Sequence, residues 1–166
     1  MGQTIPKIWA HRGASGYAPE NTIEAFERAV EMKADGVELD VQLSKDGQMV
    51  VIHDETVDRV SGVNGFVRDF TLQELRKLDV SLPIEGYHTV RIPTLAEVLE
   101  TLKPTGLEIN IELKTGIYFY PELEEKVIRL VEDMRTLADA GVDALITNYP
   151  DVAVSLLEDN SNAISK

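Results

Sequence analysis

The chain has 166 residues, of which 43% are hydrophobic and 27% charged, and this is the size and composition of one globular domain. A formal net charge of −13 disfavours general binding to nucleic acid or to an anionic membrane surface, and it leaves carboxylates for a cation site. The absence of cysteine excludes disulfides and thiolate metal sites. The N-terminal residues do not resemble a signal peptide, and no segment approaches the roughly 20 apolar residues of a membrane span, so we expect a cytoplasmic protein.

The first part of the chain predicts a strand, a loop and a helix. An apolar stretch at 8–11 predicts a strand that ends in His11-Arg12-Gly13. We expect Asn21 to be the N-cap of the helix that follows, because Glu24 stands three residues later. Gly36 is expected to end this helix.

Two further strands follow at close spacing. Residues 37–43 predict the second strand, and residues 49–53 predict the third. The segment 44–48 between them has Asp-Gly at its centre, and so short a turn ordinarily makes a hairpin. A parallel pair would need a very short crossover, so the order of strands here stays open.

Helical and strand patterns alternate through the rest of the chain. The fourth and fifth strands are expected at about 108–114 and 144–148. Helices are expected at about 71–78, 94–103, 121–140 and 152–157. This alternation predicts an α/β fold with a mostly parallel sheet.

Polar residues recur on one face of the second and fourth strands. Residues two apart in a strand share a face, so Glu38 lies with Asp40, and Glu112 lies with Asn110 and Lys114. Three carboxylates of this kind suit a hard divalent cation such as Ca²⁺ or Mg²⁺. The other interpretation is an antiparallel sheet with one solvated face, on which alternating charge indicates only contact with water.

Two histidines and two cationic residues lie at the same strand ends. His11 and His53 could do acid–base chemistry near neutral pH, and Arg12 and Lys114 could bind an anion. Each of these residues alone has an ordinary structural explanation, such as a hydrogen-bonded histidine or a surface ion pair. Together with the carboxylates they favour cleavage of a phosphoester.

These residues resemble the signature of the glycerophosphodiester phosphodiesterase family. The motifs stand in order as His11-Arg12-Gly13, Pro19-Glu20-Asn21-Thr22, Glu38-Leu39-Asp40-Val41, Val51-Ile52-His53-Asp54, Glu112-Leu113-Lys114 and Thr147-Asn148-Tyr149-Pro150-Asp151. The resemblance covers about residues 5–134 and resumes at about 135–157. It implies a single catalytic domain over residues 1–166, with a small insertion at about 54–92.

The resemblance also implies residue roles. His11 and His53 match the family's acid–base pair, whereas Arg12 and Lys114 match its phosphate-binding residues. The metal ligands that match are Glu38, Asp40 and Glu112, with Ca²⁺ or Mg²⁺ as the usual ion. Such enzymes hydrolyse glycerophosphodiesters, which are small molecules, to sn-glycerol 3-phosphate and an alcohol.

The chain departs from the family in length. The family fold is a TIM-type (β/α)₈ barrel, which needs about 250 residues, whereas only five strands can be placed here. The units expected to carry strands five to seven are missing, and one helix at about 121–140 would join the fourth strand directly to the last. These two strands should therefore be near neighbours. The sheet is then open at its edge, or a second copy of the chain covers that edge in a homo-oligomer.

Two other functions remain open at this stage. The histidine pair also occurs in phospholipases that act on lipid head groups, which should show an apolar loop facing the membrane. The chain could instead be a non-catalytic member of the family that binds a metal or a partner. Whether the strands bring the three carboxylates within reach of one metal ion separates these alternatives.

Overall fold

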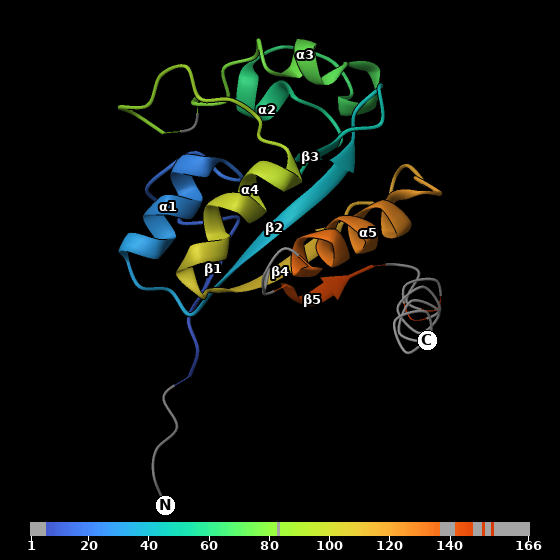
Figure 1. Cartoon of the computed structure of the whole chain (residues 1–166). Coiled ribbons are helices and arrows are strands. Elements are labelled where there is room, and N and C mark those ends of the chain that lie inside the picture. The colour runs from blue at the N-terminus through green and yellow to red at the C-terminus, as the bar shows by residue number, and fades with distance from the viewer. Residues whose placement is uncertain (1–5, 83, 137–141, 148–150, 152–153, 155–166) are drawn as a thin grey trace, which may run out of the picture.

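A five-stranded sheet with helices along one face forms the centre of the computed structural model, which describes residues 6–82, 84–136, 142–147, 151 and 154 (Figure 1). The strands are β1 (Trp9–His11), β2 (Gly36–Leu43), β3 (Met49–Val51), β4 (Glu108–Leu113) and β5 (Val142–Ile146). The strand order is β1-β2-β4-β5, with β3 also paired to β2, and every pair except β2–β3 is parallel. The predicted α/β class with a mostly parallel sheet is confirmed.

β2 is the long central strand to which most of the sheet is attached. Its first residues pair with β1, so that His11 lies opposite Glu38. Its last residues pair with β3 in the antiparallel direction, with Val41 opposite Val51. The short turn at 44–48 therefore makes the hairpin that its length favoured.

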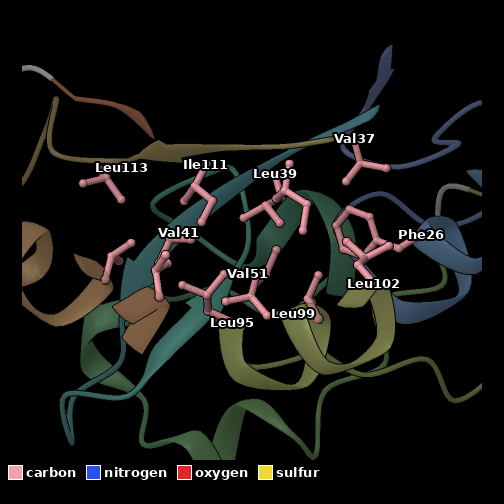
Figure 2. Close-up of a cluster of buried hydrophobic side chains, with 14 of the residues drawn as sticks. Phe26, Val37, Leu39, Val41, Val51, Leu95, Leu99, Leu102, Ile111 and Leu113 are labelled. Carbon is pink, nitrogen blue, oxygen red and sulfur yellow. The ribbon is translucent and has the colours of Figure 1, made fainter. Parts of the chain in front are cut away.

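Three helices cover one face of this sheet. They are α1 (Ile23–Glu31), α4 (Leu95–Leu102) and α5 (Leu123–Thr136). Figure 2 shows the core between helices and sheet, where Leu39 and Val41 of β2 meet Phe26 of α1 and Leu99 of α4. Because alternate strand residues face opposite sides, burying this apolar row places Glu38, Asp40 and Gln42 on the other face.

The N-cap of α1 differs from the prediction. Thr22, not Asn21, is the cap, and its hydroxyl accepts a hydrogen bond from the backbone N–H of Ala25. Asn21 has a φ of 57°, and its side chain is bonded to β2 instead. The predicted end at Gly36 is also wrong, because α1 ends at Glu31 and Gly36 already belongs to β2. A loop at 32–35, with Lys33 at a φ of 58°, turns the chain back toward the sheet.

The segment 54–92 lies beyond the carboxyl end of β2 (Figure 1). It contains α2 (Asp58–Ser61), the 3₁₀ helix η1 (Val67–Asp69) and α3 (Leu72–Leu75), so the third helix is shorter than its expected range of 71–78. Its buried side chains join Val50 and Ile52, which precede the segment, in a second hydrophobic cluster, separate from that under the sheet. The members from the segment are Val57, Val60, Val67, Leu75, Val80, Val90 and Ile92. After this segment, α4 continues into a short 3₁₀ helix, η2 (Lys103–Thr105).

A single helix, α5, joins β4 to β5. β5 pairs with β4 in parallel, with Glu112 opposite Ile146, so the prediction that these strands are neighbours is confirmed. The rest of the helix expected at 121–140 and nearly all of the helix expected at 152–157 lie outside the described residues. Within the described ranges no pairing joins β5 to β1, so the sheet is open there. None of the helices in these ranges has the length and apolar character needed to cross a membrane.

Candidate active site

The turn after β1 presents the first histidine. His11 is the last residue of β1, and Arg12 and Gly13 follow with φ angles of 57° and 75°. A Cβ atom on Gly13 would lie 2.7 Å from the backbone carbonyl carbon of Ala25, so only glycine lets this turn pack so closely on α1. The His11 side chain is 69% exposed, and its Nε2 atom lies 3.9 Å from Oε2 of Glu38.

Three carboxylates gather on the face of the sheet opposite the helices. Glu38 and Asp40 belong to β2, and Asp40 lies in register with Glu112 of β4. One oxygen atom from each of these three side chains lies within 4.8 Å of the other two. Asp40 is fully buried, Glu38 is mostly buried and Glu112 is partly exposed. The structure thus brings together the three residues predicted to bind a metal.

Arg12 and Lys114 contact different oxygen atoms of Asp40. Nε of Arg12 lies 3.4 Å from Oδ2, and Nζ of Lys114 lies 3.4 Å from Oδ1. Lys114 also donates a 2.8 Å hydrogen bond to Oε1 of Glu112. Burial lowers the pKa of Lys114, but this bond and the charges of Asp40 and Glu112 outweigh it, so the net pKa is raised and Lys114 stays cationic.

The donor set fits a hard divalent cation. Oxygen ligands from carboxylates are those that Ca²⁺ and Mg²⁺ prefer. Oδ1 of Asp40 is buried and has no hydrogen-bond partner in the described part of the chain. Burial raises the pKa of Glu38, and repulsion from Asp40 raises it further. Lys114 neutralises part of this negative charge, and a metal ion would neutralise the rest.

The second histidine follows β3 and is held by its neighbour. Nδ1 of His53 lies 2.6 Å from Oδ1 of Asp54, so the carboxylate holds the Nδ1 edge of the ring and does not use Nε2. The amide of Gln42 on β2 donates to the backbone carbonyls of Ile52, His53 and Asp54 at 3.3, 3.0 and 2.7 Å. This buried glutamine ties the histidine loop to the central strand.

The sequence did not indicate three of the side chains that support the site. Gln42 is one of them, and its position two residues after Asp40 on the polar face was the only signal. Asn21 is the second: its amide donates to Oδ2 of Asp40 at 2.9 Å, so it orients a predicted metal ligand rather than capping α1. Arg59 of α2 is the third. It bonds both Glu20 and Asp54, and no local pattern points to it.

Comparison with known proteins identifies the family. The family model described as "Glycerophosphoryl diester phosphodiesterase family" matches residues 11–126. The chain belongs to this family. It is 55% identical over 127 residues to a glycerophosphodiester phosphodiesterase of Caldanaerobacter subterraneus and 51% identical over 130 residues to one of Bacillus altitudinis. These matches cover 76% and 77% of this chain but 52% and 53% of the relatives, so the chain spans about half the length of the curated relatives it matches.

Solved structures give the same result. A glycerophosphodiester phosphodiesterase from Agrobacterium tumefaciens matches with a TM-score of 0.78 and 32% identity, over 93% of this chain and 64% of that one. An Oleispira antarctica phosphodiesterase, solved in complex with the product sn-glycerol-3-phosphate, matches with a TM-score of 0.75 and 33% identity, over 93% of this chain and 62% of that one. The predicted TIM-barrel-type family fold is confirmed: the parallel strands β1, β2, β4 and β5 correspond to a part of such a barrel, and β3 is an antiparallel addition to β2.

Proposed function

We propose that this chain hydrolyses glycerophosphodiesters to sn-glycerol 3-phosphate and an alcohol. The observation that carries the proposal is the cluster of Glu38, Asp40 and Glu112 oxygens within 4.8 Å of one another, beside a histidine at the end of β1. Membership of the family and the product bound to the Oleispira enzyme support the same substrate class. We treat residues 1–166 as one catalytic unit, with 54–92 as its insertion.

Glu38, Asp40 and Glu112 would hold the divalent cation. When bound, a Ca²⁺ or Mg²⁺ ion supplies charge stabilisation to a phosphate oxygen. Arg12 and Lys114 bind and orient the anionic phosphate from their places beside Asp40. Nε of Arg12 is a buried donor without a hydrogen-bond partner among the described residues, so it can still serve a ligand oxygen.

His11 and His53 act as the acid–base pair in this proposal. One imidazole takes the proton from the attacking hydroxyl, of water or of the substrate glycerol, and the other gives a proton to the leaving alcohol. Attack by the glycerol hydroxyl gives a cyclic phosphate, which water then opens to glycerol 3-phosphate. Asp54 holds His53 through Nδ1, and the exposed ring of His11 stands at the strand end above Glu38. Such proton transfer contributes typically a factor of about 10² to 10⁴ in rate.

A coupled assay of glycerol 3-phosphate release from glycerophosphocholine tests the proposal. We expect release that EDTA abolishes and added Ca²⁺ or Mg²⁺ restores, and we expect His11→Ala and His53→Ala each to reduce it by about 10²-fold or more. His88→Ala is the matched control, because it removes an exposed histidine from the loop that follows α3. A folded protein that binds the metal without metal-dependent release would show a non-catalytic binding protein instead.

Three finer properties are also proposed here. Calorimetric titration with each ion decides between Ca²⁺ and Mg²⁺ as the bound metal.

The open sheet carries exposed apolar side chains on both outer strands, with Trp9 on β1 37% exposed and Ile146 on β5 47% exposed. A homo-oligomer through such an edge would show in the mass measured by light scattering, and cell fractionation tests the predicted cytoplasmic location.

A further inference from the structure

Arg59 connects two loops that the sequence places far apart. Its Nε atom donates to Oδ2 of Asp54 at 2.5 Å, in the loop after β3. Its Nη1 and Nη2 atoms donate to Oε2 and Oε1 of Glu20 at 2.9 and 2.7 Å, in the loop after β1. One guanidinium therefore makes a two-pronged bond to one carboxylate and a further bond to the other.

Both carboxylates bound by Arg59 also contact a residue of the proposed active site. Oδ1 of Asp54 lies 2.6 Å from Nδ1 of His53, on the oxygen that Arg59 does not use. Oε1 of Glu20 accepts a 3.1 Å hydrogen bond from Nη1 of Arg12. An unbroken chain of hydrogen bonds thus runs from Arg12 through Glu20, Arg59 and Asp54 to His53.

The charges in this chain alternate and stabilise one another. Hydrogen bonds to Glu20 and Asp54 raise the pKa of Arg59 far above its usual value. Burial raises the pKa of Glu20, but the bonds and charges of Arg59 and Arg12 outweigh it and lower the pKa overall. Burial acts on Asp54 in the same way, and its bonds to Arg59 and His53 again lower its pKa overall. Both carboxylates are therefore ionised, which the bonds to Arg59 require.

We propose that Arg59 is a positioning residue that holds Asp54 against Nδ1 of His53 and Glu20 against Arg12. The loop after β1, which carries Arg12, and the loop after β3, which carries His53, thereby keep one relative geometry. Its catalytic consequence rests on the proposed phosphodiesterase function. The positioning itself does not. Lysine cannot replace arginine here, because one ammonium lacks the planar fork that binds Glu20 twice while also reaching Asp54.

The structure also indicates how loss of Arg59 would change His53. The charged groups joined to the ring by the bonds described above are Asp54, then Arg59, then Glu20 and Arg12. Loss of Arg59 removes a nearby positive charge, which favours the imidazolium form, and it also releases Asp54, which favours the neutral ring, so the proton affinity of His53 shifts unless the two effects are equal. Replacement by lysine keeps the charge but loses the fork, so the geometry is disturbed more than the charge.

The experiment uses Arg59→Gln, Arg59→Lys and the control Arg91→Gln. Arg91 is an exposed arginine of the same segment and makes no hydrogen bond or ion pair within the described ranges. Titration of the histidine ring signals by NMR between about pH 5 and 9 measures the proton affinity of each histidine. We expect Arg59→Gln to shift the proton affinity of His53 by about threefold or more and to leave that of His88 unchanged.

Kinetics supply the second measurement. We expect both Arg59 variants to lower kcat by about tenfold or more, because the histidine is misplaced, with a smaller change in KM. Arg91→Gln should match the wild type in both measurements. Should Arg59→Gln fail to fold, the drop in kcat of a folded Arg59→Lys decides.

Two results would overturn the proposal. One is a titration of His53 in folded Arg59→Gln that matches that in Arg91→Gln. The other is a kcat in folded Arg59→Lys that matches the wild type. If the wild type itself releases no glycerol 3-phosphate, the proposed function fails, and the NMR titration still decides whether Arg59 governs His53.

Discussion

Both faces of the sheet are largely buried at β2, but burial stabilises one face and disfavours the charges on the other. Leu39 and Asp40 are adjacent and both fully buried. Leu39 lies among apolar side chains of the strands and helices, whereas Asp40 lies among Arg12, Lys114 and Asn21. Burial of apolar surface stabilises the helix-covered face, whereas the opposite face holds charges that burial disfavours.

Among the described residues, the buried side-chain nitrogen and oxygen atoms that lack a hydrogen-bond partner lie on the charged face or beside it. In the described part of the chain these side-chain atoms are Arg12 Nε, Asp40 Oδ1, Gln42 Oε1 and Asn110 Oδ1. Asp40, Gln42 and Asn110 lie on the polar face of β2 and β4, and Arg12 lies beside it. The helix-covered face is therefore built for stability, and unused bonding capacity is concentrated where the proposed ligands bind.

Truncating the apolar face should give the largest effect. Leu39→Ala removes a fully buried side chain between sheet and helices, and we expect it to lower the free energy of unfolding by about 2–5 kcal/mol. Urea unfolding followed by circular dichroism measures this change. A loss below about 1 kcal/mol would contradict the packing described for this face.

The matched substitution on the polar face should act on the ligand rather than on stability. Glu38→Gln removes a charge whose pKa is raised by burial and by Asp40, and a glutamine carbonyl can still accept the backbone N–H of Arg12. We expect the free energy of unfolding measured in EDTA to stay the same or to rise. The affinity for the metal ion should fall by about tenfold or more. A variant as destabilised as Leu39→Ala would show that the two faces do not differ.

Acid should weaken the bonds that Glu20 and Asp54 make with Arg59 and so lower the stability of the fold. The pKa values of Glu20 and Asp54 are lower in the folded chain than in the unfolded chain. At a pH between the folded and the unfolded pKa of each group, the unfolded chain therefore binds more protons than the folded chain. Their stabilising effect is therefore present above about pH 4 and is lost as the pH falls through the folded values. Urea unfolding at a series of acidic pH values measures it. Arg59→Gln should flatten this dependence, and an equally steep curve in that variant would contradict the role of Arg59 in lowering these values.

The sequence predicted the features that depend on local pattern. Alternation along Val37–Val41 separated the two faces correctly, and the short turn at 44–48 was consistent with the hairpin. The helices expected from 71 and 94 start there, and Thr71 and Thr94 form capping boxes with Glu74 and Glu97. These features depend on residues a few positions apart, so a single sequence carries the information.

Features that depend on distant partners escaped the sequence. Asparagine is a residue type that N-caps favour, but the side chain of Asn21 is hydrogen-bonded to Asp40, nineteen residues away. Thr22 is therefore the N-cap of α1. Arg59 reaches Glu20 from thirty-nine residues away. No periodicity encodes such contacts, so only the folded arrangement of the loops identifies these residues.

The smallest expected effect concerns the N-terminal end of α4, a helix whose buried side chains belong to the apolar core. Thr94→Ala removes the N-cap of α4, whose hydroxyl accepts the backbone N–H of Glu97 while the Glu97 carboxylate accepts the backbone N–H of Thr94. We expect a loss of about 1 kcal/mol in the free energy of unfolding. Because the buried side chains of α4 belong to the apolar core and not to the carboxylate cluster, metal affinity measured by calorimetry should stay at the wild-type value. Thr94→Ser, which keeps the hydroxyl, is the control and should restore most of the stability. A fall in metal affinity in folded Thr94→Ala would show that strain on the helix-covered face reaches the carboxylates through β2, and the division between the two faces would then fail.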